Sequence, residues 1–235
     1  MSDLLVARHE GYAVLTLNRP EKLNALSRQL VDAVVETLNR FSRERTRVLV
    51  LRARSGVKVW SSGHDVGELP EGGRDPLGWD DPLRYFVRAI EECPAPIIAM
   101  IEGGVWGGAC EVAFACDLII AAPSATFAVT PARLGVPYNV TGMLTFLNAC
   151  SLRIVKEMAF TARPIAAVES RGSVSSTMLA SASSVSWSST AARCARPVTT
   201  MTRCWPARSV TRSHVSRSRL CPLPEGTAPK LTLTG

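Results

Sequence analysis

Only the first 167 of the 235 residues carry an apolar pattern that can form a buried core. Beyond Ala167 the apolar residues follow neither the period of a helix nor that of a strand. This tail has 14 serines in 68 residues, against eight in the preceding 167, and lacks Ile, Phe, Tyr, Asn, Asp and Gln. Such a segment cannot readily offset its ordering entropy by burial. We therefore expect one domain over residues 1–167 and a disordered tail over residues 168–235.

The net charge of +7 arises entirely from this tail. Residues 168–235 hold nine Lys and Arg and two Glu, which leaves 18 basic and 18 acidic residues in the first 167. An arm that binds nucleic acid is one interpretation, but the arginines are dispersed and only Trp187 and Trp205 could stack on bases. A frame-shifted translation of a GC-rich gene is another, since most of the missing residue types have AT-rich codons. We expect no nucleic-acid partner.

Composition and cysteine usage indicate a soluble protein from a reducing compartment. The chain is 46% hydrophobic and 20% charged, as in globular proteins. No apolar run approaches the roughly 18 residues of a membrane span, and the first ten residues contain no signal-peptide core. The seven cysteines lack CxxC spacing and are too sparse for a disulfide scaffold. We expect a cytoplasmic protein without a membrane partner.

Strands and helices are expected to alternate over residues 1–167. Ser27 can cap a helix whose apolar side chains recur at helical spacing, and the pair Asp81 and Pro82 is typical of a helix start. Further helices are expected over residues 109–116 and 152–160. Strands are expected over residues 4–8, 12–17, 48–51, 96–101, 118–121 and 126–129. This alternation predicts an α/β domain.

Two glycine-containing turns are the best candidates for chemistry. They span residues 61–65, SSGHD, and residues 103–111, GGVWGGACE. The second turn leads directly into a predicted helix, whose free N–H groups and positive dipole end favour an anion. If the first turn presents an N–H group to the same point, the two donors form an oxyanion hole. Glycine turns before helices are also common structural features.

Other familiar sites find less support in the sequence. No G-x-S-x-G elbow is present for a serine hydrolase, and Asp65 is badly placed to orient the ring of its neighbour His64. His64 and Glu68 have the spacing of a metal-binding pair, but no second histidine is near, so we expect no metal site. The glycine-rich motifs that bind nucleotide phosphates are absent.

Several strings in residues 1–167 are shared with a known family. They are RPEKLNAL (19–26), SSGHD (61–65), EGGVWGGACE (102–111), CDLIIAA (116–122) and TPARLGVP (130–137). On these motifs the chain resembles the crotonase superfamily of enoyl-CoA hydratases and isomerases. The resemblance implies a ββα superhelical spiral, an acyl-CoA substrate and no cofactor beyond the CoA moiety of that substrate. It also implies a homotrimer or a dimer of trimers.

The resemblance assigns roles to individual residues. It places the backbone N–H groups of His64 and Gly108 as the oxyanion donors, and Tyr138 beside a departing carboxylate. Thr130 lies on the same substrate-facing turn, and the His64 ring need not take part. Residues matching segments that line the adenine and pantetheine of CoA are Lys22, Leu23, Ala25, Ser62, Gly63, Asp65 and Val66.

The position of Glu111 separates two reaction classes within the family. A hydratase needs two carboxylates, and Glu111 occupies the first position while Pro131 aligns with the second. One carboxylate cannot easily run both halves of a water addition. Glu111 can alternatively be a buried, hydrogen-bonded residue near the pocket.

The strings over residues 61–84, 105–111, 130–139 and 160–167 resemble the branch that decarboxylates methylmalonyl-CoA to propionyl-CoA through a thioester enolate. A hydratase or isomerase is the alternative enzyme. A catalytically impaired CoA-binding or interaction protein is the alternative from another class. It gains support because the family's C-terminal helices, which cover the pocket and support the trimer, cannot be mapped onto residues 168–235.

Overall fold

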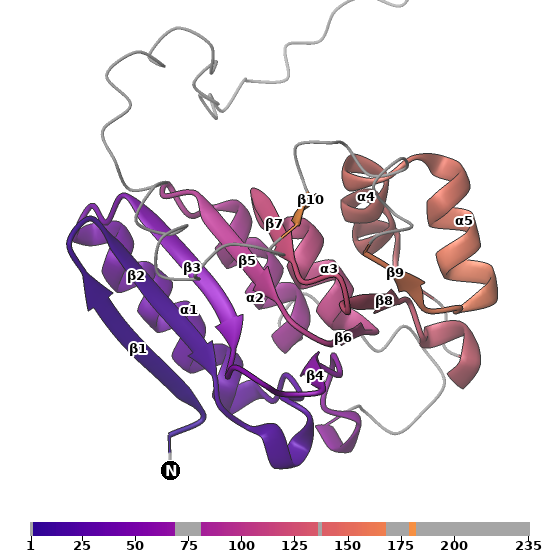
Figure 1. The fold of residues 1–235 in the computed structure, drawn as a ribbon, viewed down its shortest axis with the longest axis horizontal. Helices are drawn as coiled ribbons and strands as arrows, with labels where there is room; N and C mark the ends of the chain where they lie inside the picture. The colour runs from indigo at the N-terminus through magenta and orange to yellow at the C-terminus, as the bar shows by residue number, and fades with distance from the viewer. Residues whose placement is uncertain (1, 69–80, 136–137, 168–178, 182–235) are drawn as a thin grey trace, which may run out of the picture. The chain divides into compact units, whose positions relative to one another are not determined.

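The computed structural model describes residues 2–68, 81–135, 138–167 and 179–181, all within one compact unit that spans Met1–Pro197. In these residues two β-sheets carry the α-helices (Figure 1). None of the helices in the described ranges is both long enough and apolar enough to cross a membrane. The predicted alternation of strands and helices is confirmed.

The larger sheet has six strands. Their order is β1 (Leu4–His9), β2 (Tyr12–Leu17), β3 (Val48–Ala53), β5 (Ile97–Ile101), β7 (Leu118–Ala121) and β10 (Leu179–Ser181). Only the pair β1–β2 is antiparallel. Every residue of β5 is buried, as is typical of parallel strands covered on both faces.

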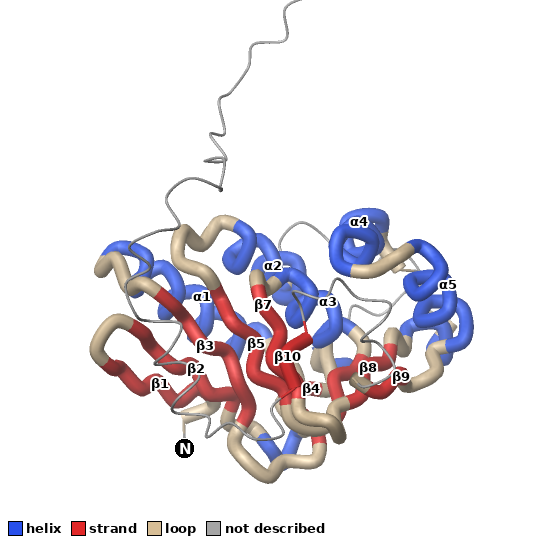
Figure 2. Tube along the Cα trace, turned by 45° about the horizontal axis from the view of Figure 1, so that its top comes forward, coloured by secondary structure: helices blue, strands red, loops and turns tan. Residues whose placement is uncertain are grey.

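Helices α1 (Arg28–Arg43) and α2 (Pro82–Glu91) cover one face of this sheet (Figures 1 and 2). As predicted, Ser27 caps α1, because its hydroxyl accepts a hydrogen bond from the Leu30 N–H group. Asp81 caps α2 in the same way, and Pro82 occupies its first turn. The predicted apolar face of α1 is buried: Leu30, Val31, Val34, Val35, Leu38 and Phe41.

The smaller sheet positions one of the two glycine turns. It contains β4 (Val59–Ser61), β6 (Gly104–Trp106), β8 (Thr126–Ala128) and β9 (Ile165–Ala166), in that order. Helix α3 (Gly108–Ala115) follows β6 after one residue. The prediction of a continuous glycine turn was wrong over Gly104–Trp106, because pairing with both β4 and β8 holds these residues extended.

Helices α4 (Val140–Ala149) and α5 (Leu152–Thr161) lie at the end of the unit furthest from β1 (Figures 1 and 2). The sequence did not predict α4, because its valine, two threonines and glycine are weak helix formers. Asn139 starts this helix, since its side-chain oxygen accepts from the Gly142 N–H group at 2.7 Å. Helix α5 begins where it was predicted, at Leu152.

The predicted tail contains one described element. Leu179–Ser181 forms β10, which pairs in parallel with β7. No apolar period predicted this strand, because three residues are too few to show one. The rest of residues 168–235 lies outside the described ranges. The prediction of disorder made for these residues therefore stays a prediction.

Candidate active site

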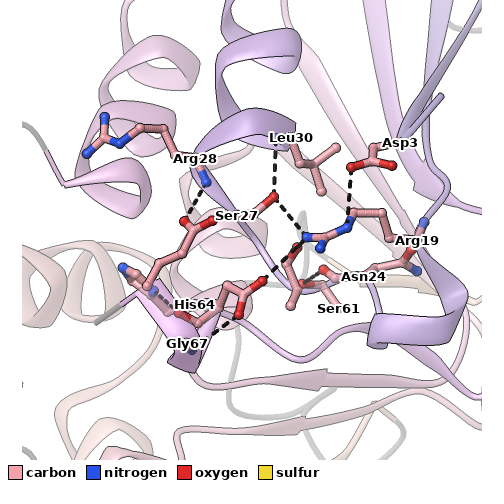
Figure 3. Close-up of polar contacts among 12 residues, drawn as sticks. Asp3, Arg19, Asn24, Ser27, Arg28, Leu30, Ser61, His64 and Gly67 are labelled. Carbon is pink, nitrogen blue, oxygen red and sulfur yellow. Dashed lines mark hydrogen bonds and ion pairs between the residues drawn. The ribbon is translucent and has the colours of Figure 1, made fainter. Parts of the chain in front are cut away.

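The first glycine turn is held against the segment that precedes α1. The Ser62 N–H group donates to the Leu23 carbonyl at 2.9 Å, and the Leu26 N–H group donates to the Gly63 carbonyl at 2.8 Å. Leu26 and His64 form an isolated parallel bridge. The segment before α1 and the segment after β4 are therefore neighbours, although they lie almost 40 residues apart in the sequence (Figure 3). Both segments were predicted to line the CoA site.

Arg19 joins these stretches to the start of the chain. Its guanidinium lies 3.3 Å from a carboxylate oxygen of Asp3 and 3.5 Å from one of Asp65, and it donates to the Ser27 hydroxyl at 2.8 Å (Figure 3). The other carboxylate oxygen of Asp65 accepts from the Gly67 N–H group. Asp65, predicted to line the CoA site, is thus also a structural link between two loops.

The two glycine turns lie in direct contact at Gly63. A Cβ atom at this position would lie 2.7 Å from the Gly108 nitrogen and 2.6 Å from the Trp106 carbonyl oxygen. The φ angle of Gly63 is 89°, so a larger residue is excluded by both space and conformation. Because the His64 nitrogen is bonded to the Gly63 carbonyl carbon, standard geometry places it within about 6 Å of the Gly108 nitrogen.

The amides of His64 and Gly108 are available as donors. Among the described residues, neither N–H group donates to a protein acceptor. Gly108 is the first residue of α3, where N–H groups have no partner within the helix and the dipole is positive. The preceding Gly107 is fixed by donation to the Ala128 carbonyl at 2.8 Å. These two amides are the donors predicted for an oxyanion hole, and that role stays a prediction.

The His64 ring is held by both of its nitrogen atoms. Nε2 lies 2.8 Å from Oδ2 of Asp81, and Nδ1 lies 3.1 Å from the carbonyl oxygen of Asp65. The second oxygen of Asp81 accepts from the Leu83 N–H group at the start of α2. Burial lowers the pKa of His64, but the hydrogen bond and charge of Asp81, with smaller contributions from the Asp65 carbonyl and Glu68, together raise the pKa above 6.5.

Glu111 is fully buried on α3, and both of its oxygen atoms are occupied. Oε1 lies 2.6 Å from the Arg84 guanidinium, and Oε2 accepts from the Tyr138 hydroxyl at 2.9 Å. Burial raises the pKa of Glu111, while the donations from Tyr138 and Arg84 limit that rise. The sequence left open whether Glu111 is a catalytic base or a buried hydrogen-bonded residue, and these contacts are those of the second.

Tyr138 is fixed from a second direction by α4. Its ring packs edge-on against Phe146, with 5.3 Å between ring centroids. A Cβ atom at Gly142 would lie 2.3 Å from the Tyr138 ring and 2.6 Å from Oε2 of Glu111. Tyr138 and Glu111 can therefore meet here only because Gly142 has no side chain.

The first turn of α2 contacts all three parts of the site. Asp81 binds His64, Leu83 packs against Gly108, and Arg84 binds Glu111. The sequence marked Asp81 only as a helix cap and gave Arg84 no role. The spacing of Asp81 and Arg84 could have suggested that both side chains face one way, since residues three apart share a helix face.

The other predicted site residues surround the same two turns. The Oγ1 atom of Thr130 would lie 3.0 Å from a Cβ atom at Gly107. Leu23 and Val66 are exposed apolar residues, at 46% and 68%, beside the first turn. The structure brings together, on the segments before α1 and after β4, the residues assigned to CoA: Lys22, Leu23, Ala25, Ser62, Gly63, Asp65 and Val66.

Glu68, which the sequence pairs with His64 at metal-binding spacing, has another role. Oε2 of Glu68 accepts from the Arg28 N–H group at 2.7 Å, at the start of α1 (Figure 3). Within the described ranges, no group of three or more His, Cys, Asp or Glu residues is placed to hold a metal ion.

Comparison with known proteins gives a consistent set of relatives. The family model described as enoyl-CoA hydratase/isomerase matches residues 7–193, so the match continues past the predicted boundary at residue 167. The chain is 52% identical over 155 residues to methylmalonyl-CoA decarboxylase of Escherichia coli K12, which is 66% of this chain and 59% of that protein. It is 34% identical over 167 residues to human mitochondrial enoyl-CoA hydratase domain-containing protein 2, covering 70% of this chain and 57% of that protein.

The solved structures agree with these sequence relatives. Methylmalonyl-CoA decarboxylase in complex with 2S-carboxypropyl-CoA superimposes with a TM-score of 0.77 and 41% identity, over 83% of this chain and 75% of that one. This likeness confirms the predicted fold class. The chain spans less than three fifths of the length of the two curated relatives it matches.

Proposed function

The chain belongs to the enoyl-CoA hydratase/isomerase family, and from this premise we propose that it decarboxylates methylmalonyl-CoA to propionyl-CoA. The relative with 52% identity is a decarboxylase named for this substrate, and one similar structure holds a carboxypropyl-CoA ligand. The proposed catalytic groups are the amides of His64 and Gly108 together with Tyr138. The reaction as proposed uses no cofactor beyond the CoA of the substrate.

The observation that carries the proposal is that the Glu111 carboxylate is buried and hydrogen-bonded through both of its oxygen atoms. A residue that activates water needs a carboxylate that the water can reach and that can take a proton from it. Both oxygens of Glu111 accept hydrogen bonds already, from Arg84 and from Tyr138, and the side chain is inaccessible to solvent. Pro131 stands where the resemblance places the second hydratase carboxylate. This site is therefore poorly equipped for water addition and needs a reaction that starts without a base.

Decarboxylation meets this requirement, since its first step removes no proton. The bond between the α-carbon and the carboxylate breaks, CO2 leaves, and the electron pair spreads onto the thioester oxygen as an enolate. The N–H groups of His64 and Gly108 would stabilise that oxygen more strongly as its charge develops. A proton from water then adds to the α-carbon and gives propionyl-CoA.

Tyr138 would set the orientation of the departing carboxylate. The breaking bond has to stand out of the thioester plane so that its electrons can enter the carbonyl system. The single O–H proton of Tyr138 goes to Glu111, which Arg84 holds in turn. The ring would therefore restrict the carboxylate by its position, without giving it a hydrogen bond that stabilises the ground state.

The test is CO2 release from methylmalonyl-CoA, with crotonyl-CoA hydration measured in parallel. We expect CO2 release, and about a tenfold lower kcat/KM in Tyr138→Phe, because the ring remains but the hydrogen bond to Glu111 no longer fixes its position. Tyr85→Phe, on the exposed side of α2, is the matched control and should match the unmodified chain.

Three outcomes would contradict the proposal. Turnover of crotonyl-CoA in place of methylmalonyl-CoA would indicate a hydratase. Binding of an acyl-CoA without turnover of either substrate would indicate an impaired CoA-binding protein. Equal rates for Tyr138→Phe and the unmodified chain would remove the Tyr138 hydroxyl, and its hydrogen bond to Glu111, from the mechanism.

A further inference from the structure

Both ring nitrogens of His64 face oxygen atoms that are placed to accept. The Asp65 carbonyl has no proton to give, and Asp81 already accepts from the Leu83 N–H group through its other oxygen. A neutral imidazole carries a single N–H group and could satisfy only one of these contacts. An imidazolium, with a proton on each nitrogen, satisfies both contacts while Asp81 stays ionised.

The charges around His64 favour this state. Asp81 approaches from the start of α2, while Asp65 and Glu68 belong to the loop of His64 itself. Of the described cations, Arg19 binds Asp65 and Arg84 binds Glu111. Burial is the largest single influence and lowers the pKa of His64, but the hydrogen bond and charge of Asp81, the Asp65 carbonyl and the charge of Glu68 together raise it above its ordinary value.

We propose that Asp81 is a positioning residue, which holds His64 as an imidazolium and thereby fixes loop 61–68 against the first turn of α2. In this arrangement one carboxylate caps α2 and anchors the residue whose amide is assigned to the oxyanion hole. The effect on catalysis rests on the proposed function. The charge of His64 and its link to Asp81 are properties of the protein without substrate.

The arrangement implies a definite dependence on pH. A histidine whose pKa is raised on folding contributes its stabilisation fully below the unfolded value, and loses it as pH rises through the folded value. Deprotonation removes one of the two N–H groups and frees either Asp81 or the Asp65 carbonyl. We therefore expect kcat/KM for methylmalonyl-CoA to fall on the alkaline side, through the raised pKa of His64, to a lower plateau.

Asp81→Asn tests the charge while keeping the shape. Asparagine still caps α2, but its NH2 group can donate to Nε2 of His64, so the ring can remain in place as a neutral donor from Nδ1. We expect the His64 titration, followed by NMR of the ring C–H proton in the full chain, to move down by about one unit or more. His64→Gln identifies the signal among the three histidines.

The kinetic result expected for Asp81→Asn is a kcat/KM about tenfold lower near neutral pH, which is about 1.4 kcal/mol. Its alkaline decline should disappear, so that its profile meets that of the unmodified chain at high pH. His64→Gln keeps the backbone amide and should show the same loss, and the double variant should lose nothing further. Glu44→Gln, which breaks the exposed ion pair with Arg8, is the matched control and should change neither readout.

An unchanged His64 titration in Asp81→Asn would overturn the inference, and so would an alkaline decline that persists in both variants. If Asp81→Asn does not fold, His64→Gln with unaltered circular dichroism decides the kinetic part, and the titration of the unmodified chain against 6.5 decides the charge. If the unmodified chain releases no CO2, the proposed function fails, whereas the NMR titration still supports or refutes the link between His64 and Asp81.

Discussion

Helices α1 and α2 bury their apolar side chains almost completely, whereas α4 and α5 leave several of theirs in solvent. Leu30 on α1 and Phe86 on α2 are both 0% exposed, while Val140 on α4 and Phe160 on α5 are 76% and 77% exposed. Among the described residues, α4 packs against α3 and α5. The covered helices are amphipathic and need one buried face, but a helix with apolar residues all around needs cover on more than one side.

The candidate site draws unequally on these two regions. His64, Gly108, Glu111 and Arg84 all belong to the part that α1, α2 and the sheets enclose, whereas Tyr138 comes from the segment just before α4. Among the described site residues, the hydrogen bond from Tyr138 to Glu111 joins the two sides. We therefore expect the proposed oxyanion donors to depend on the buried scaffold, and the proposed orientation of the carboxylate to depend on the less covered region.

Removing Arg84 should give the largest effect. Arg84→Met leaves the carboxylate of Glu111 buried without a counter-charge, which costs about 3–5 kcal/mol of unfolding free energy. The loss, measured by chemical denaturation, should shrink at acidic pH, because a buried carboxyl with a raised pKa is readily protonated there.

The control for Arg84 is an ion pair in the other region. Arg163→Met breaks the pair with Glu157, in which the two side chains are 50% and 37% exposed, and should cost at most about 1 kcal/mol. Equal losses in the two variants would contradict the contrast between the covered and uncovered regions.

The Gly108 amide provides a test that concerns the reaction and not the fold. Gly108→Pro removes the N–H group at the first position of α3, where proline is well tolerated. Gly108→Ala keeps that group but introduces the same contact with Leu83. We expect kcat/KM for CO2 release to be about 10²–10³ lower in the proline variant than in the alanine variant. Similar rates would exclude this amide as an oxyanion donor.

Much of the covered region could be predicted because its signals are local. Ser27 and Asp81 were predicted as caps from their own residue types, and the six buried residues of α1 from spacing alone. The approach of the two glycine turns was only a conditional hypothesis, and Gly63 permits it, since a Cβ atom there would lie 2.7 Å from the Gly108 nitrogen. The roles of the predicted site residues remain predictions.

The contacts that organise the site could not be predicted in this way. His64 and Asp81 are 17 positions apart, and Arg84 and Glu111 are 27 apart. Such pairs depend on how α2 is rotated against α3, which no short-range pattern encodes. Asp65 was judged unable to orient the His64 side chain, and the carboxylate that binds the ring came from another element. The expected trimer, the absence of a cofactor and the character of the tail likewise stay predictions.

The smallest effect on stability is expected where the apolar side chains are already exposed. Replacing Val140 and Phe160 by serine removes no contact in the covered core, so the unfolding free energy should change by no more than about 0.5 kcal/mol. If the uncovered faces of α4 and α5 meet other copies, as the expected trimer requires, the fraction of monomer in size-exclusion chromatography should rise. Lys156→Ser, on the exposed side of α5, is the control and should leave that fraction unchanged. A clear fall in melting temperature with an unchanged fraction of monomer would show that these side chains are covered by the chain itself, and the contrast between the two regions would then disappear.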